Sequence, residues 1–257
     1  MTTFSNRTDY RRSIDALRHR ADQGDADASF ELGCLLEEGV IGKDRRRIIA
    51  PAPVKAVAAY RRAVKLGDLG ALLNLGVCHD NGIGVRRNKH RALLCYLRLW
   101  NSTRDGSAAS NIATVHRDVG DHRGAIRWWR KAVKAGDSGC LVDIGYCLCY
   151  GIGVRRDIAK ALAKFTMACR TRNIAEFDRE AAFFYRAVVH LDRGGGRNRT
   201  RARALLAGAN ADNDYPEARA LLAQIDTEIE PTPCRCRRGW LQTVAGQAPC
   251  ALHRRRD

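Results

Sequence analysis

Proline and long apolar runs are scarce in this sequence. Only six of its 257 residues are proline, and the abundance of alanine, leucine and arginine favours helices over strands. No stretch approaches the ~20 consecutive apolar residues of a membrane-spanning helix. Residues 1–7 lack the apolar core of a secretory signal peptide. We therefore expect a helical, cytoplasmic protein without a membrane span.

Acidic residues are few compared with basic ones. The chain has 28 Asp and Glu against 45 Lys and Arg, which gives a formal net charge of +17. Of the basic residues, 37 are arginine, whose planar guanidinium group suits recognition of carboxylates or phosphates. These arginines are spread along the whole chain, however, as GC-rich codon usage would also produce. The net charge alone therefore leaves the choice of partner open.

The sequence repeats itself. Residues 75–87 recur almost unchanged as residues 144–156, and residues 63–68 recur as 132–137, both with an offset of 69 residues. This offset equals two units of about 34 residues, the length of a helix-turn-helix repeat. Glycines mark three units with identical spacing: a Gly-Asp step, a second glycine nine residues later and a third after six more. They are Gly24, Gly33 and Gly39; Gly67, Gly76 and Gly82; and Gly136, Gly145 and Gly151.

Another pattern identifies the second helix of each unit. A small residue is followed by a bulky one at i+4 and by a small or apolar one at i+7, so that all three lie on one helix face. We expect this face to pack in the core, where small residues allow helices to approach and the bulky residue fills the space between them. The five sets are Ala56, Tyr60 and Ala63; Ala92, Tyr96 and Leu99; Ala125, Trp129 and Ala132; Ala161, Phe165 and Ala168; and Ala202, Leu206 and Ala209.

Glycines and short polar residues predict the turns. Gly67 and Gly136 lie where a second helix ends, in a left-handed conformation that glycine adopts without strain. The aspartate after each is expected to cap the next helix. Asn88 and Asp157 are the expected caps of two second helices. The glycine-rich loops before them lack the preceding strand and the Lys-Ser/Thr pair of a phosphate-binding loop.

Together these motifs resemble the Sel-1-like repeat, a relative of the tetratricopeptide repeat, over about residues 10–226. The copies that begin at Asp68 and Asp137 match best, the copy at Asp25 has an enlarged basic loop, and the unit over residues 106–136 lacks the Gly-x-Gly loop. The resemblance implies an all-α fold: a right-handed α/α superhelix, or solenoid, of antiparallel helix pairs. We assign this solenoid to residues 1–229.

Family members commonly assemble protein complexes, and stacked helix pairs present a groove that suits a peptide or a helix. We therefore expect a non-catalytic protein-protein interaction scaffold with a protein partner in its concave groove, and no cofactor or small-molecule substrate for the solenoid. The sequence contains no catalytic motif that we recognise. His79 and Asp80 are expected at the surface near the end of a first helix, and Cys147 and Cys149 as small core residues.

Ten cysteines occur in this chain without a visible export signal. Some exported members of the family clip each helix pair with disulfides. Here Cys78 recurs as Cys147, but Cys95 corresponds to Lys164, so the cysteine pairs do not follow the repeat. We expect free thiols or metal ligands instead of disulfides.

The composition changes in residues 230–257, which we treat as a separate tail rich in arginine and cysteine. Pro231 and Pro233 end helical structure. Four side chains of the tail match the ligand types of a tetrahedral zinc site, and they are Cys234, Cys236, Cys250 and His253. The arrangement loosely resembles the short Cys-x-Cys…Cys-x-His class of zinc motifs, although two residues separate its last two ligands. The alternative is a disordered tail with incidental cysteines.

Bound zinc would hold the arginines of the tail near Trp240, a basic and aromatic surface that suits nucleic acid. These arginines are Arg235, Arg237, Arg238, Arg254, Arg255 and Arg256. The alternative function is therefore that of a zinc-dependent nucleic-acid-binding protein that acts through its tail.

Overall fold

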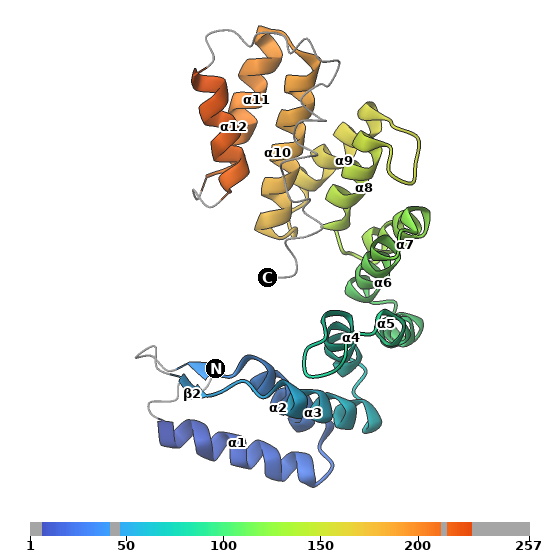
Figure 1. The fold of residues 1–257 in the computed structure, drawn as a ribbon, viewed down its shortest axis with the longest axis vertical. Coiled ribbons are helices and arrows are strands. Elements are labelled where there is room, and N and C mark those ends of the chain that lie inside the picture. The colour runs from blue at the N-terminus through green and yellow to red at the C-terminus, as the bar shows by residue number, and fades with distance from the viewer. Residues whose placement is uncertain (1–6, 42–46, 212–214, 228–257) are drawn as a thin grey trace. The chain divides into compact units, whose positions relative to one another are not determined.

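The computed structural model describes residues 7–41, 47–211 and 215–227 (Figure 1). These residues form twelve helices and two short strands. The first elements are α1 (Arg7–Asp22), α2 (Ala26–Glu38), β1 (Val40–Ile41), β2 (Arg47–Ile49), α3 (Pro53–Lys65), α4 (Ala71–Asn81), α5 (Lys89–Thr103) and α6 (Gly106–Asp118). The others are α7 (His122–Lys134), α8 (Cys140–Tyr150), α9 (Ile158–Arg170), α10 (Glu176–Arg193), α11 (Gly196–Ala209) and α12 (Pro216–Thr227).

The chain divides into two compact units, Met1–Val115 and His116–Asp257. In the first unit, α1 packs against α2, α2 against α3, α3 against α4 and α4 against α5. The same holds in the second unit from α7 to α12, where α8 also contacts α10. Each unit is therefore built from successive helix pairs, and the predicted all-α fold is confirmed. No helix in the described part of the chain is long and apolar enough to span a membrane.

The enlarged loop after α2 contains a short hairpin. Its strands β1 and β2 pair antiparallel, with Val40 opposite Ile49 and Ile41 opposite Arg47. The β-branched residues at these positions favour extended backbone. The repeat pattern predicted only a loop here, so the hairpin is a local addition to the all-α fold.

The predicted core face is buried in every repeat. The fifteen residues of the five small-bulky-small sets are all at most 5% exposed. The bulky members Tyr60, Tyr96, Trp129 and Phe165 are among the largest side chains that are almost fully buried. The periodic pattern therefore identified the packed face of each second helix.

In three helix pairs, the bulky residue of the second helix lies on a glycine of the first. The pairs are Gly33 with Tyr60, Gly76 with Tyr96, and Gly145 with Phe165. A Cβ added to Gly33 would lie 2.5 Å from a ring carbon of Tyr60, which is far inside van der Waals contact. The second glycine of each unit is therefore required for packing, because only a bare Cα lets the ring come this close.

A further glycine contact joins one helix pair to the pair before it. Gly84, in the loop between α4 and α5, lies against the carbonyl group of Pro53 at the start of α3. Gly153 lies in the same way against His122 at the start of α7, where an added Cβ would be 2.7 Å from the Cβ of His122. Both glycines have a left-handed φ, of +65° and +66°. Only glycine satisfies this backbone and this close approach together.

The predicted caps of two second helices are present. Asn88 Oδ1 accepts a hydrogen bond from the backbone N–H of Arg91 (2.9 Å) at the start of α5. Asp157 Oδ1 accepts one from the backbone N–H of Lys160 (2.9 Å) at the start of α9. Each cap satisfies one of the N–H groups that has no partner within its helix.

The Gly-Asp steps at Gly67 and Gly136 turn the chain as predicted but cap less directly. Gly67 and Gly136 have φ of +103° and +100°, which confirms their left-handed conformation. Asp68 accepts hydrogen bonds from the backbone N–H groups of Gly70 (2.7 Å) and Ala71 (3.3 Å). Since Gly70 is the residue that flanks α4, the aspartate lies two residues before the cap position. It orders the turn that leads into the helix.

Candidate binding surface

The predicted zinc ligands Cys234, Cys236, Cys250 and His253 lie outside the described residues. Within the region that the structure describes, no group of three or more His, Cys, Asp or Glu side chains is placed to hold a metal ion. The seven cysteines of this region are free.

The cysteines in the middle of the chain are core residues. Cys147 and Cys149 are buried, as predicted, and so is Cys78 at the position that matches Cys147. Burial raises the pKa of each of these three thiols to about 12. Because the thiolate is the reactive form of cysteine, these side chains are inert at neutral pH.

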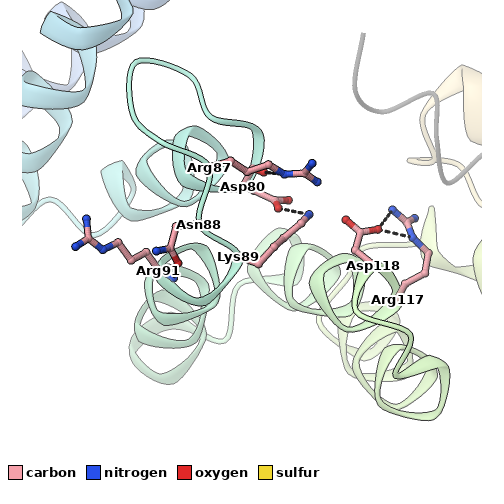
Figure 2. Close-up of polar contacts among 7 residues, drawn as sticks. All are labelled: Asp80, Arg87, Asn88, Lys89, Arg91, Arg117 and Asp118. Carbon is pink, nitrogen blue, oxygen red and sulfur yellow. Dashed lines mark hydrogen bonds and ion pairs between the residues drawn. The ribbon is translucent and has the colours of Figure 1, made fainter.

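His79 and Asp80 are buried, so the expectation that they lie on the surface was wrong. Each is only 5% exposed, because the segment that leads into α5 covers the end of α4. The backbone N–H of Asn88 donates a hydrogen bond to the carbonyl group of His79 (2.6 Å). Figure 2 shows Lys89 reaching Asp80, with which it forms an ion pair.

A cleft of about 550 Å³ opens beside the loop between α8 and α9. Its lining combines four cations with one carboxylate and two apolar residues: Arg130, Arg155, Arg156 and Lys160, then Asp157, then Leu148 and Val154. Two of these residues fix the loop. Arg156 Nε donates to the carbonyl group of Cys149 (3.0 Å), and Asp157 forms an ion pair with Lys160 (2.9 Å). All four of these cations are exposed residues.

A matching set of cations occurs 69 positions earlier, in the first unit. Arg61, Arg86, Arg87 and Arg91 match Arg130, Arg155, Arg156 and Lys160, respectively. Arg87 Nε donates to the carbonyl group of Asp80 (2.9 Å; Figure 2), as its counterpart does in the second unit. We call Arg61, Arg86 and Arg91 the first basic site, and Arg130, Arg155 and Lys160 the second basic site. All six residues are exposed.

His79 lies close to two cations of the first basic site. Burial, and then the charges of Arg61 and Arg91, lower its pKa. Its Nδ1 atom is buried and has no hydrogen-bond partner among the described residues. Leu148 stands at the equivalent position 69 residues later and lines the cleft there.

Another cleft, of about 590 Å³, lies between α1, α2 and α3 and also contains cations. Two of these are neutralised by nearby acids: Arg18 pairs with Asp15 (3.0 Å) and Arg62 with Asp22 (2.7 Å). In the two basic sites, by comparison, five of the six cations form no ion pair within the described part of the chain, and the sixth, Lys160, pairs with Asp157. The sequence contained the signal for these sites, because the cations share the offset of the repeat, but the even spread of arginine along the chain obscured it.

Four segments of this chain match the Sel1 repeat family: residues 26–68, 70–99, 118–137 and 139–170. The rat (Rattus norvegicus) protein DAP3-binding cell death enhancer 1 is 31% identical over 85 residues, which are 33% of this chain and 15% of that protein. The chain therefore matches only a small part of the length of that relative.

Solved structures share the fold. A protective antigen of uropathogenic Escherichia coli that displays an SLR fold has a TM-score of 0.69 at 24% identity, over 85% of this chain and 45% of the antigen. A Sel1 repeat protein from Oxalobacter formigenes has a TM-score of 0.64 at 19% identity, over 84% and 90% of the two chains. YrrB, a TPR protein with an unusual peptide-binding site, has a TM-score of 0.50 at 17% identity, over 81% and 98%. With its matched repeats and this shared fold of helix pairs, the chain is a Sel1-like repeat protein.

Proposed function

We propose that this chain is a non-catalytic scaffold that binds a partner protein, with a peptide or a helix held in the concave groove that stacked helix pairs provide. The observation that carries the proposal is the repeated contact of a glycine with an aromatic ring. Three helix pairs, distributed over both units, use the same motif to pack. The repeat thus serves to stack helices, and burial raises the pKa of its thiols Cys78, Cys147 and Cys149 to about 12.

The similar proteins also support a scaffold that binds a protein partner. YrrB, which shares the fold, is described by its peptide-binding site, and the rat relative is named for binding DAP3. A cytoplasmic location fits the seven free thiols of the described region, because a reducing compartment keeps cysteines unpaired.

Affinity purification with mass spectrometry tests the scaffold proposal, with the full chain and a version that ends at residue 230 run in parallel. We expect both to retain the same partner, and a purified fragment of that partner to bind the purified protein in calorimetry. Recovery of no protein beyond those that bind the resin alone would contradict the proposal. A partner retained only by the full chain would assign binding to the tail instead.

The tail carries a second proposal, which rests on the sequence alone. Cys234, Cys236, Cys250 and His253 have the ligand types and number of a tetrahedral zinc site, and arginines surround them in sequence. We propose that they bind zinc and that the arginines then contact nucleic acid. Metal analysis should find about one zinc ion per chain, lost in the Cys234→Ser, Cys236→Ser variant.

The nucleic-acid part of this proposal has its own measurement. Binding of a labelled oligonucleotide should weaken steeply with salt and disappear when residues 231–257 are deleted. Equal binding by the deleted protein would reject a role of the tail. A metal-free protein that binds the oligonucleotide as well as the zinc-loaded one would reject the dependence on zinc.

A further inference from the structure

The two basic sites share one pattern of cations at an offset of 69 residues, in two different units. In each site, one cation comes from a second helix: Arg61 on α3 or Arg130 on α7. Another comes from the glycine-rich loop that follows, Arg86 or Arg155. The third comes from the first turn of the next second helix, where Arg91 on α5 and Lys160 on α9 correspond. Three separate elements thus contribute matching cations to each site.

The loop that carries Arg86 or Arg155 is held in place by hydrogen bonds and packing contacts of its own. Arg87 and Arg156 donate to carbonyl groups at the ends of α4 and α8. Gly84 and Gly153 pack on the starts of α3 and α7, which are the helices that carry Arg61 and Arg130. The loop is therefore fastened to both helix ends, which fixes the backbone position of Arg86 and Arg155. A binding surface with such order loses less conformational entropy when it takes a ligand.

Positive charge in these sites is only partly balanced by acids among the described residues. Arg156 in the cleft of the second basic site pairs with Asp192 (3.8 Å), and the cleft itself contains four cations and one carboxylate, that of Asp157, which pairs with Lys160. Asn88 replaces this carboxylate in the first basic site, so that even this neutralisation is missing there. Crowded like charges are unfavourable, and an anionic ligand would relieve the repulsion. By contrast, Arg18 and Arg62 in the cleft between α1 and α3 have acidic partners.

An independent observation at the first basic site also points to a ligand. His79 is 5% exposed, and its Nδ1 atom has no hydrogen-bond partner in the described region. It lies within electrostatic reach of Arg61 and Arg91. A buried polar atom without a partner is unfavourable, and here it occurs beside Arg61 and Arg91, which form no ion pair with any residue that the structure describes.

We propose that each basic site binds a carboxylate-bearing segment of a partner protein, a short stretch rich in glutamate or aspartate. The proposal rests on the scaffold function above and specifies its partner. Guanidinium groups bind carboxylates through paired hydrogen bonds, and Val154 and Leu148 offer apolar contact for the neighbouring side chains of a peptide. The cleft of about 550 Å³ has the size of a site for a few side chains. Nucleic acid would instead need a longer track of cations along its backbone.

Fluorescence anisotropy with a defined probe tests the proposal on the full chain. The probe is a fluorescein-labelled peptide of alternating glutamate and leucine, at about 0.1 M salt. We expect each basic site to take one peptide. The Arg61→Glu, Arg91→Glu variant should lose the first site, and the Arg130→Glu, Arg155→Glu variant the second, each with affinity at that site weakened about tenfold or more. Combining all four changes should abolish binding.

A matched control separates the sites from the net charge. The Arg172→Glu, Arg201→Glu variant reverses the same number of charges on exposed residues of the second unit that do not line the cleft. It should bind the peptide like the unmodified protein, and circular dichroism should show equal helix content in all variants. Equal loss of binding in this control and in the site variants would overturn the proposal, because it would show attraction by net charge alone.

Two further measurements identify the ligand. A carboxylate seated at the first basic site should raise the pKa of His79, followed by NMR of its ring, since a nearby negative charge favours the protonated form. No change at His79 when the peptide saturates the protein would argue against this site. A single-stranded oligothymidylate that displaces the peptide and binds more tightly through the same arginines would overturn the protein-partner proposal in favour of nucleic acid.

The two proposals can fail separately. If the charge-reversed variants still retain the same partner as the unmodified protein, and do so equally well, the scaffold function stands and the basic sites are rejected. If no partner is retained by any form of the chain, the scaffold function itself is rejected, whatever the peptide does.

Discussion

The ring of Tyr96 on α5 lies against the bare Cα of Gly76 on α4, and a Cβ at this glycine would overlap the ring. The contact fixes how closely the two helices pack. Tyr96 is almost fully buried, so the ring has little room to move aside. The equivalent contacts of Gly33 and Gly145 show that this is the general way in which these repeats close a helix pair.

The first prediction is that Gly76→Ala destabilises the protein. The added methyl group forces the ring of Tyr96 or the helix backbone to shift, and such overpacking costs about 1–3 kcal/mol. Unfolding in urea, followed by circular dichroism, measures the loss as a lower free energy of unfolding.

A matched control is Gly196→Ala, because a Cβ on this glycine meets nothing within 4 Å and its φ is not left-handed. This exposed residue at the start of α11 should change stability by no more than about 0.5 kcal/mol. Equal effects of the two substitutions would show that the glycine-aromatic contact does not limit helix packing.

The second prediction concerns the cap of α5. Asn88→Ala removes the acceptor for the backbone N–H of Arg91 and should lower the free energy of unfolding by about 1 kcal/mol. Asn88→Asp should be close to neutral, because aspartate has the same role at Asp157 in the other repeat. Thermal unfolding of both variants measures the two effects. A larger loss of stability in Asn88→Asp than in Asn88→Ala would contradict a capping role.

Periodic features of this fold could be read from the sequence because each has a local physical cause. The three-residue sets such as Ala56, Tyr60 and Ala63 mark a helix face by their spacing, and all of them are buried. The left-handed turns at Gly67 and Gly136 could be predicted because glycine adopts this conformation without strain. What pattern could not supply was the contact between a glycine and the ring on another helix, because this depends on how the helices pack.

His79 and Asp80 were wrongly predicted to lie at the surface because another segment of the chain buries them. Both are polar and stand near the end of a helix, where local rules place residues at the surface, yet the segment before α5 folds over them. The basic sites were missed for the opposite reason. Arg61 and Arg130 share the offset of 69 residues, but only the structure shows the cleft in which Arg130 meets further cations from the loop and from the following helix. The zinc site of the tail stays a prediction.

The third prediction concerns the dependence of stability on pH. The pKa of His79 is lowered below its ordinary value of 6.5 in the folded protein, mainly by burial. Between the two pKa values the unfolded chain binds more protons than the folded one, so stability falls as the pH falls below the unfolded value. Replacing His79 by leucine, the residue at the equivalent position 148, should remove this contribution.

Unfolding in urea over a series of pH values tests this predicted dependence of stability on pH. The unmodified protein should lose stability on acidification below about pH 6.5 more steeply than His79→Leu does. His190, whose pKa is also lowered, is present in both proteins and cancels in the comparison. Parallel pH profiles would mean that His79 titrates alike in the folded and unfolded states.

The last prediction is that the core thiols resist alkylation in the folded protein. At about pH 8 an ordinary thiol is roughly one quarter thiolate, whereas a pKa of about 12 leaves Cys78, Cys147 and Cys149 thiolate in about one chain in ten thousand. Because the thiolate is the form that reacts, iodoacetamide should modify these three residues far more slowly in buffer than in urea. Mass spectrometry of proteolytic peptides reports each cysteine separately. Rapid labelling of Cys147 in buffer would show that α8 is exposed to solvent, in conflict with its role as the buried first helix of a pair.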